Sequence, residues 1–229
     1  MPVSRASELS ASSQNYLKAV WLLQEWSGDP VSKTALAQRV GVKISAASDA
    51  VRKLTDQGLL LDTRYGAIDL TPAGRAVAVE MVRRHRLIET FLVTTLDYRW
   101  DQVHQEAEAL EHAVSDFMVD RMDAVLGHPT RDPHGDPIPQ PDGTTSKPDA
   151  IPLTTLSPGQ QGRVERISDQ NSELLQYCAG HGITIGAIVA VELGTPFSET
   201  LGVFVPGSTR PVQLGTGATD AIWVTPLPE

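Results

Sequence analysis

Apolar residues recur at helical spacing through the first quarter of the chain, and breakers divide them into short elements. Residues 15–23 carry such a stripe, and the sequence SGDP follows at residues 27–30, so we predict a helix that ends before this cluster. A second helix is expected over residues 33–39 with Ser32 as its cap, followed by a tight turn at Gly41. A third is expected from a Ser45 cap to about residue 57, with Gly58 as its stop.

Two short apolar runs come next, over residues 59–62 and 67–70. They predict a two-stranded wing with a basic, aromatic tip, after which Thr71 caps another helix and Pro72 takes its first position. Short helices around a glycine turn, followed by a wing, are typical of a winged helix-turn-helix. This front part of the chain is therefore expected to bind DNA.

The third helix has the surface that such binding requires. Its apolar positions face inward, which leaves short hydroxyl residues to approach the major groove and basic residues to contact phosphates or guanine edges. Asp49 does not fit this surface well, because its negative charge would repel phosphate. It could instead accept a hydrogen bond from a cytosine amino group. The residues expected to contact DNA are Lys43, Ser45, Ser48, Asp49, Arg52, Lys53, Arg64 and Tyr65.

The middle of the chain predicts two long helices. Residues 73–96 carry a broad apolar face, and residues 102–126, with Asp101 as cap, repeat apolar positions every three to four residues. The stripe is wider than one small bundle needs, so we expect it to continue into a second copy of the chain. A homodimer through the helices of residues 77–126 would have the two-fold symmetry that reads a palindromic site.

The last third changes character. Residues 130–158 are rich in Pro, Gly and Asp and predict a linker or extended arm, with His128 and His134 on its surface. From about residue 156, short β-rich runs alternate with glycine turns around one helical run, SELLQYCAGHG. This pattern predicts a small barrel. Cys178 within it is expected to be a small buried hydrophobe.

Composition and charge limit the function. The chain has 229 residues with a single cysteine, which excludes an internal disulfide. No stretch approaches the ~18 apolar residues of a membrane span, and the first residues lack the apolar core of a secretory signal, so we expect a cytoplasmic protein. The net charge is −9, but residues 1–86 hold twelve Lys and Arg against eight Asp and Glu, and residues 87–229 hold seven against twenty. The basic N-terminal part can bind phosphate, and the acidic C-terminal part can attract cations.

Six metal-capable side chains concentrate the candidate chemistry. His85 and Glu89 are spaced i, i+4, and the segment VHQEAEALEH places His104, Glu108, Glu111 and His112 at i, i+4, i+7 and i+8. On a helix these offsets gather on one stripe. Charged residues on a helix are usually only a solvated face, but two such groups in succession favour a metal site. Nitrogen and oxygen donors without thiolate suit Mn(II) or Fe(II).

The motifs in order are SQNYLKAVW, the winged helix through LTPAGR, MVRRHRLIE, VHQEAEALEH and RDPHGDPIP. In this order they resemble the diphtheria toxin repressor family of metal-dependent regulators, in its manganese-responsive branch, the manganese transport regulators. The resemblance covers nearly the whole chain and implies an α+β fold. It implies a winged helix-turn-helix over residues 1–76, a helical dimerisation and metal-binding domain with a Pro-rich linker over residues 77–150, and a small β-barrel of Src-homology or FeoA-like type over residues 151–229.

The resemblance also implies two metal ions per subunit. One site would use Asn15, Glu108, Glu111 and His112, and the other His85, Glu89 and His104 with a ligand from the barrel. For that ligand Asp169 is favoured over Glu173. Iron-sensing relatives carry Cys where this chain has Glu108, and a carboxylate in place of a thiolate favours Mn(II). Manganese sensors usually carry Asp where this chain has Asn15, whose neutral amide oxygen coordinates more weakly.

The expected function is a Mn(II)-dependent, DNA-binding transcriptional repressor of metal-transport and homeostasis genes. Metal binding would favour the DNA-competent conformation of a homodimer on a palindromic operator. No membrane and no small-molecule substrate are expected. Fe(II) in place of Mn(II), and activation in place of repression, stay open. The contrasting alternative is a metal-dependent hydrolase, but the chain has no HExxH motif and no nucleophile in a recognisable turn, so we expect no enzyme.

Overall fold

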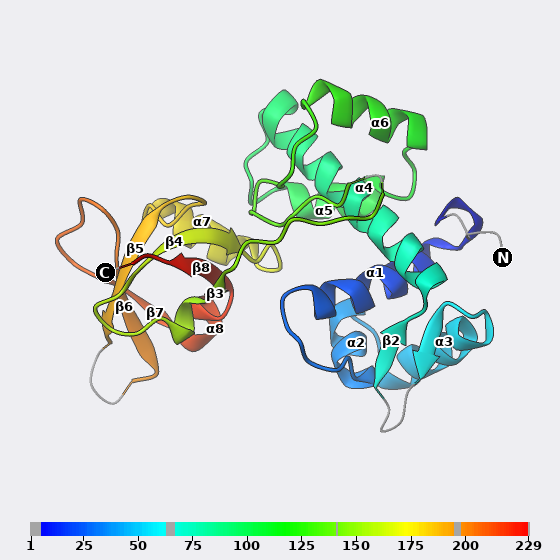
Figure 1. Ribbon diagram of the computed structural model, residues 1–229, viewed down its shortest axis with the longest axis horizontal. Coiled ribbons are helices and arrows are strands. Elements are labelled where there is room, and N and C mark those ends of the chain that lie inside the picture. The colour runs from blue at the N-terminus through cyan, green and yellow to red at the C-terminus, as the bar shows by residue number, and fades with distance from the viewer. Residues whose placement is uncertain (1–5, 63–66, 141, 195–197, 229) are drawn as a thin grey trace. The chain divides into compact units, whose positions relative to one another are not determined.

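The computed structural model describes residues 6–62, 67–140, 142–194 and 198–228. The chain forms two compact units, Met1–His85 with Pro139–Thr145, and Arg86–Ile138 with Ser146–Glu229. The division falls within one continuous helix, α4 (Pro72–Leu96). Figure 1 shows the elements of both units, and each unit is described by itself below.

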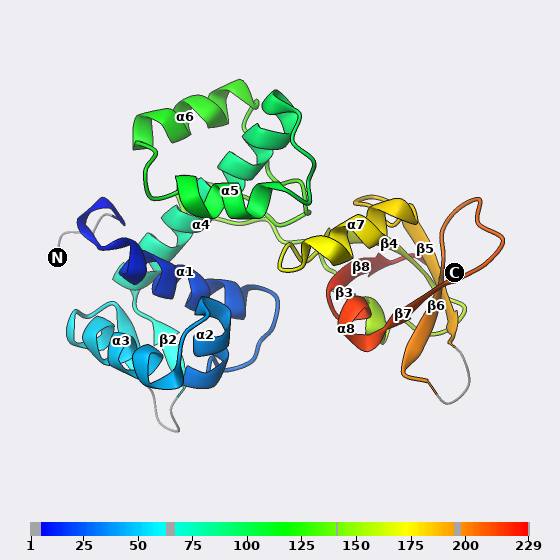
Figure 2. The same cartoon turned by 180° about the vertical axis from the view of Figure 1, so that it is seen from behind.

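Three helices and a hairpin precede the α4 part of the first unit (Figures 1 and 2). They are α1 (Ala11–Glu25), α2 (Lys33–Val40), α3 (Ile44–Asp56), β1 (Leu60–Asp62) and β2 (Ile68–Leu70). The two strands pair antiparallel. The apolar faces of these elements meet in one core that includes Leu17, Leu36 and Leu54. The predicted order of helix, helix, helix and wing is confirmed.

Local capping explains where these helices begin and end. Ser32 accepts a hydrogen bond from the amide of Ala35 at 3.1 Å and starts α2. Gly41 and Gly58 end α2 and α3 with φ of 73° and 72°, a region that glycine adopts at no steric cost. The predicted Ser45 cap is wrong. The chain enters α3 one residue earlier, at Ile44, and the residue before it makes no side-chain cap hydrogen bond.

The single helix predicted over residues 102–126 is also wrong. The chain forms α5 (Val103–Leu110) and α6 (Asp116–Val125), with a turn between them. Ser115 accepts a hydrogen bond from the amide of Met118 at 3.2 Å, so a new cap interrupts a stripe whose apolar spacing continues through the turn. Glu111 is the C-cap of α5, and His112 therefore lies beyond that helix.

Asp101 does not cap α5 as predicted. The residue before α5 is Gln102, which makes no side-chain cap hydrogen bond. The Asp101 carboxylate instead accepts hydrogen bonds from Arg99 at 2.9 and 3.0 Å and from Gln176 at 2.8 Å. This carboxylate links the start of α5 to α7 (Ser172–Gly180).

Residues 131–137 form a packed turn, so the linker prediction is wrong for this segment. Arg131 and Pro137 form an isolated β-bridge. The Asp132 carboxylate accepts hydrogen bonds from the amides of His134 and Asp136, both at 2.9 Å. Because the carboxylate satisfies these amides, a turn rich in Pro, Gly and Asp can be buried. His134 is fully buried, contrary to the expectation of a surface histidine.

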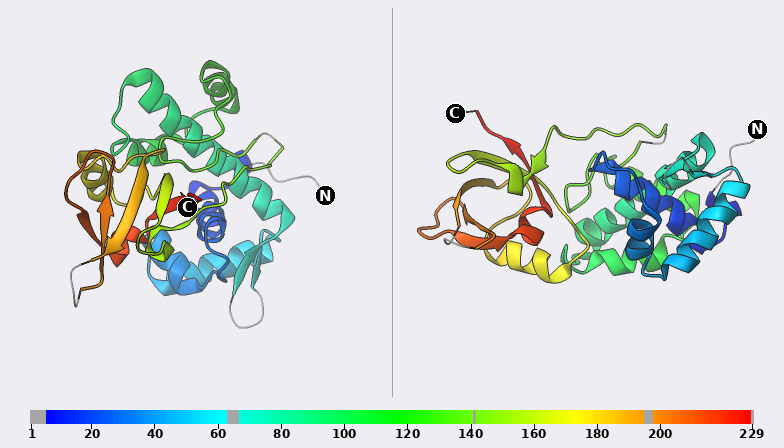
Figure 3. Two further views of the ribbon diagram at one scale, coloured as in Figure 1. Left: turned by 60° about the vertical axis from the view of Figure 1, so that its left-hand side comes forward. Right: turned by 90° about the horizontal axis from the view of Figure 1, so that it is seen from below.

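A six-stranded antiparallel sheet forms the C-terminal part of the second unit. Its strands are β3 (Ile151–Pro152), β4 (Gln161–Ile167), β5 (Ile188–Leu193), β6 (Thr200–Phe204), β7 (Val212–Gly215) and β8 (Ile222–Pro226). They lie in the order β3-β8-β4-β5-β6-β7. Among the described residues the two end strands do not pair with each other, so the sheet is open and not the closed barrel we expected. Helix α7 lies against this sheet (Figure 3). Its Leu175 and Cys178 belong to the core of the sheet, and Cys178 is buried as predicted.

The α+β fold class is confirmed, with helices in the first half of the chain and an antiparallel sheet in the last third. The division into three domains at residues 76 and 150 stays a prediction. Within the described residues, no helix is both long and apolar enough to cross a membrane.

Candidate metal centre and DNA-binding helix

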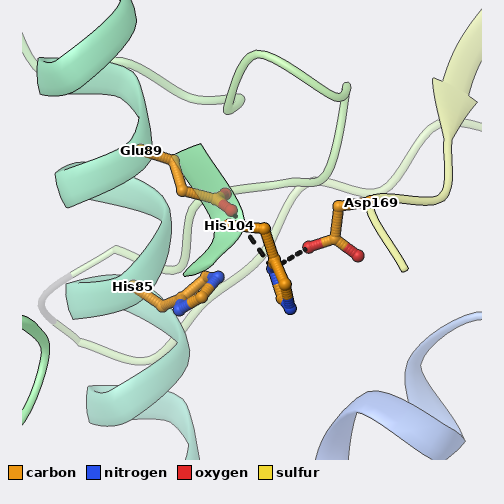
Figure 4. A group of neighbouring side chains, drawn as sticks. All are labelled: His85, Glu89, His104 and Asp169. Atoms are coloured by element: carbon orange, nitrogen blue, oxygen red, sulfur yellow. Dashed lines mark ion pairs between the residues drawn. The ribbon is translucent and has the colours of Figure 1, made fainter. Parts of the chain in front are cut away.

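Helix α4 presents the first two candidate donors. It starts where Thr71 accepts a hydrogen bond from the amide of Gly74 at 3.0 Å, and it continues without a break through His85 and Glu89. Their i, i+4 spacing puts both side chains on one face, and Figure 4 shows them projecting from successive turns. Both are buried, Glu89 completely. A carboxylate in this position needs a nearby positive charge or strong hydrogen bonds.

His104 and Asp169 complete this group. His104 comes from α5, and Asp169 follows the end of β4. The Nδ1 atom of His104 lies 2.9 Å from Oδ2 of Asp169 and 3.4 Å from Oε1 of Glu89 (Figure 4). One ligand atom from each of His85, Glu89, His104 and Asp169 lies within 4.8 Å of the others. We call these four residues the His104 cluster.

The charges of the His104 cluster fit a cation. Burial alone would lower the pKa of His104, but its hydrogen bonds with Asp169 and Glu89 raise that pKa to about 10. Burial would raise the pKa of Asp169, yet the hydrogen bond with His104 holds it well below its usual range. The two carboxylates thus favour a positive charge at His104. A divalent ion would take the place of the imidazole proton, because a histidine nitrogen binds metal only when it is unprotonated. Two imidazole nitrogens and two carboxylate oxygens are donors that a divalent ion such as Mn(II) or Fe(II) accepts.

Two further donors lie beside the His104 cluster, and the sequence did not point to them. Glu89, Asp132 and His134 form a second buried group within 4.8 Å, in which Nδ1 of His134 lies 3.6 Å from Oε2 of Glu89. Burial and the charge of Asp136 raise the pKa of Asp132. The spacing Asp-x-His in a Gly- and Pro-rich segment was the available clue, but composition suggested a solvated linker.

The other predicted metal ligands gather around the end of α5. Glu108 and Glu111 each offer an oxygen within 4.8 Å of His85, and Nε2 of His112 lies 3.5 Å from Oε1 of Glu111. Glu111 is fully buried. We call Glu108, Glu111 and His112 the Glu108 cluster. The sequence predicts that these ligands share one helical stripe. Helix α5 ends at Leu110, so of the predicted ligands it contains only His104 and Glu108.

Asn15 belongs to α1 in the first unit. Its side-chain oxygen is buried and accepts no hydrogen bond within the described ranges. A buried amide oxygen without a donor is unfavourable unless it has another partner. A divalent cation is one partner that this oxygen could bind.

A polar pocket of about 370 Å³ opens beside His104 and Asp169. Its wall includes the side chains of Gln102, Gln105 and Gln176. These uncharged groups can hydrogen-bond to water. Arg99 and Asp101 also line the pocket, so both charged and uncharged polar groups surround the open side of His104 and Asp169.

The predicted DNA-contacting residues lie on and before α3. Lys43, Ser45 and Lys53 are exposed. The Ser48 hydroxyl donates a hydrogen bond to the carbonyl of Ile44 at 2.9 Å, and Arg52 pairs with Asp49 at 2.8 Å on the surface. Asp49 thus faces a positive charge from its own helix. Arg64 and Tyr65, expected at the wing tip, lie outside the described residues.

Three family models match the chain in the order of these parts. Residues 8–68 match the N-terminal DNA-binding domain of iron-dependent repressors, and residues 71–140 match their metal-binding and dimerisation domain. Residues 151–226 match the FeoA domain. The chain therefore carries the sequence features of a DNA-binding, metal-binding and dimerising regulator.

Individual relatives agree with these matches. The iron-dependent repressor IdeR of Mycobacterium leprae is 29% identical over 214 residues, which cover 88% of this chain and 91% of that protein. IdeR of Mycobacterium tuberculosis is 34% identical over 133 residues, 58% of this chain and only 57% of that protein. A solved manganese-dependent transcriptional repressor in complex with manganese is 49% identical, with a TM-score of 0.88 over 94% of this chain and 100% of that one.

These matches replace the hydrolase alternative, because the relatives are repressors that bind DNA and not enzymes. The resemblance found in the motifs is thereby confirmed over both halves of the chain. The chain belongs to the iron-dependent repressor family, which includes the diphtheria toxin repressors and consists of metal-dependent transcriptional repressors.

Proposed function

We propose that the chain is a Mn(II)-dependent repressor, which binds a palindromic operator as a homodimer and controls genes of metal transport. The observation that carries this proposal is the His104 cluster, where four nitrogen and oxygen donors from three separate segments converge within 4.8 Å. A protein that needed these residues only for solubility would leave them in solvent.

The choice of Mn(II) rests on donor chemistry. None of the proposed ligands is a thiolate, and carboxylate oxygens favour a hard ion. Glu108 contributes an oxygen at the position where iron-sensing relatives carry Cys. We propose two ions per subunit, one at the His104 cluster and one at the Glu108 cluster with Asn15. Asp132 and His134 are additional candidates for the first of these.

The proposed coupling to DNA runs through α4. A bound divalent ion would neutralise the buried carboxylates and link α4, α5 and the segment after β4. Helix α4 begins directly after β2 of the wing and carries both His85 and Glu89. Fixing the far part of this helix restricts how the winged helix can turn, which favours the spacing of half-sites that a dimer must match.

Exposed apolar side chains on α5 and α6 support the proposed dimer. They are Leu110, Phe117, Met118 and Val125, of which Phe117 is 74% exposed. Large apolar groups gathered on two neighbouring helices are typical of a protein interface. Two copies of α3 would then read the two halves of the operator. A repressor must act where its operator lies, and we propose a cytoplasmic location for this one.

The test is binding of fluorescently labelled duplexes, selected from a random pool, followed by anisotropy at fixed salt. Mn(II), Fe(II) and Zn(II) are titrated separately into the metal-free protein. Mn(II) should raise affinity about 100-fold, which corresponds to about 2.7 kcal/mol of coupling. DNA binding that ignores all three ions would remove the sensor from the proposal.

Fe(II) is the second candidate ion, because the mycobacterial relatives are named iron-dependent repressors. The same titration separates the two metals. If anaerobic Fe(II) activates at a lower free concentration than Mn(II), iron takes the place of manganese in the proposal.

A further inference from the structure

Strand β4 contains an irregularity that faces the 131–137 turn. Its pairing with β8 shifts register between Val164 and Arg166, so that Glu165 is an extra residue. A bulge of this kind turns one side chain away from the regular alternation of the strand. Glu165 is only 6% exposed. Its carboxylate has therefore been directed to partners within the second unit.

Those partners are guanidinium groups. Glu165 pairs with Arg131 of the turn at 2.6 Å and with Arg163 of its own strand at 2.9 Å. Burial would raise the pKa of Glu165, but these two hydrogen-bonded arginines lower it. The next residue, Arg166, donates to Asp136 at the other end of the turn at 2.7 Å. Two oppositely oriented ion pairs thus fix the turn along β4.

The backbones of β4 and the 131–137 turn are also in contact. The amide of Ile167 donates a hydrogen bond to the carbonyl of His134 at 3.0 Å. Beside it, Gly135 has φ of +89°, and a Cβ atom there would lie 1.9 Å from the carbonyl oxygen of Glu165. No side chain fits at that distance, so the strand and the turn can approach this closely only because residue 135 is glycine.

Both partners of this contact carry proposed metal donors. The turn holds Asp132 and His134, and Asp169 follows Ile167 after one intervening residue. We propose that Glu165, Arg131 and Gly135 are positioning residues of the metal centre: they fasten β4 to the 131–137 turn and so hold Asp169 and His134 at ligating distance from α4 and α5. This inference rests on the proposed metal-sensing function.

A glycine pair provides a matched test. Gly135 and Gly159 share φ of +89°, but a Cβ at Gly159 would meet nothing within 4 Å. Gly135→Ala and Gly159→Ala therefore carry the same backbone strain and differ in the close approach to β4. Both are made in the full chain with Glu108→Ala, which removes a donor of the Glu108 cluster. Mn(II) affinity should fall about tenfold or more in Gly135→Ala, as for other residues that orient ligands, and less than twofold in Gly159→Ala.

A second measurement needs no metal. Hydrogen exchange of the Ile167 amide is followed in the metal-free chain, since this amide bonds to His134. It should be protected in the parent and in Gly159→Ala, and lose at least tenfold protection in Gly135→Ala. Unchanged protection or unchanged Mn(II) affinity in Gly135→Ala would overturn the positioning role. A parent chain without Mn(II) affinity would instead overturn the proposed function, and the exchange result alone would then decide whether the turn is fastened to β4.

Arg131 supplies a variant that leaves the backbone unstrained, in case Gly135→Ala does not fold. Arg131→Met keeps the aliphatic stem and removes the charge next to Glu165, and it should weaken Mn(II) binding several-fold with a parallel loss of Ile167 protection. Arg131→Lys retains the charge and should recover most of both. A lysine variant no better than methionine would show that the charge next to Glu165 does not restore either property, and it would overturn the role of the Arg131 ion pair.

Discussion

Nδ1 of His104 lies 2.9 Å from Oδ2 of Asp169, and this contact joins helix α5 to the segment that follows the sheet strand β4. Glu173, the other residue considered for the same role, lies in the first turn of α7 and is not part of the His104 cluster. The position of Asp169 therefore supports it as the donor from the C-terminal part of the chain.

Asp169→Asn should weaken Mn(II) binding. The amide keeps the size of the side chain and one oxygen, but it removes the negative charge that attracts the ion, so we expect a loss of at least about tenfold. Glu173→Gln makes the same chemical change nearby and should leave the affinity unaltered. Free Mn(II), measured by electron paramagnetic resonance during titration, reports both. An equal effect of the two changes would count against Asp169 as a ligand.

His134→Ala should destabilise the fold as well as the metal centre. The ring is fully buried, stacks on Trp100 and has its Nε2 atom 2.8 Å from the Trp100 carbonyl. Truncation leaves a cavity and an unsatisfied polar group, at a cost of about 2–4 kcal/mol. His128→Ala is the control. That side chain is 71% exposed, and its partner Asp123 is 11% exposed. Removing the His128 ring leaves no cavity in the core, so the loss should be about 1 kcal/mol, from the lost hydrogen bond alone. Urea unfolding without metal that gives equal losses would contradict this prediction.

Asn15→Asp should lower the Mn(II) concentration needed for DNA binding. The buried side-chain oxygen would gain a negative charge, which strengthens attraction to a cation. We expect half-maximal DNA binding at about tenfold less Mn(II), measured by anisotropy. Ser12→Asp adds the same charge at an exposed position of α1 and should have little effect. An unchanged midpoint for Asn15→Asp would indicate that this oxygen does not contact the ion.

Asp49→Ala should strengthen binding to DNA. Asp49 forms an ion pair with Arg52 at 2.8 Å, and the two side chains are 69% and 74% exposed. Removing Asp49 frees the Arg52 guanidinium to bind a phosphate and also removes a negative charge that repels DNA. The salt dependence of log affinity should steepen by about one ion, as for one added phosphate contact. Asp56→Ala, an equal charge change at the exposed end of α3, is the control. Identical salt slopes for the two variants would argue against contact at residue 49.

Local chemistry made the first unit predictable. Ser32, Gly41, Gly58 and Thr71 each act within three or four residues of the helix end that they define, so the sequence contains the information needed. The break between α5 and α6 follows a different rule. Its apolar spacing continues through residues 111–115, and only the competing cap at Ser115 ends the periodicity. Periodicity alone cannot reveal a cap of that kind.

The residues of the candidate site also fall into those that could be predicted from the sequence and those that could not. His85 and Glu89 could be paired from their spacing, because one helix fixes both. Asp132 and His134 could not, since their burial depends on a bulge in β4 that is distant in the sequence. Composition suggested a solvated arm there. It does not reveal the hydrogen bonds that two backbone amides of the turn donate to the Asp132 carboxylate.

The donors of the His104 cluster are also ordered in time, because a ribosome makes them from the N-terminus. A chain interrupted before β4 already contains the whole winged helix together with His85, Glu89 and His104, yet it lacks the oxygen of Asp169 and the strand against which the 131–137 turn packs. Such a fragment keeps the winged helix and the Glu108 cluster but lacks one donor of the His104 cluster. Premature termination or proteolysis between residues 138 and 161 should therefore remove one of the two proposed metal sites and leave the other, so that the two sites can be separated along the chain.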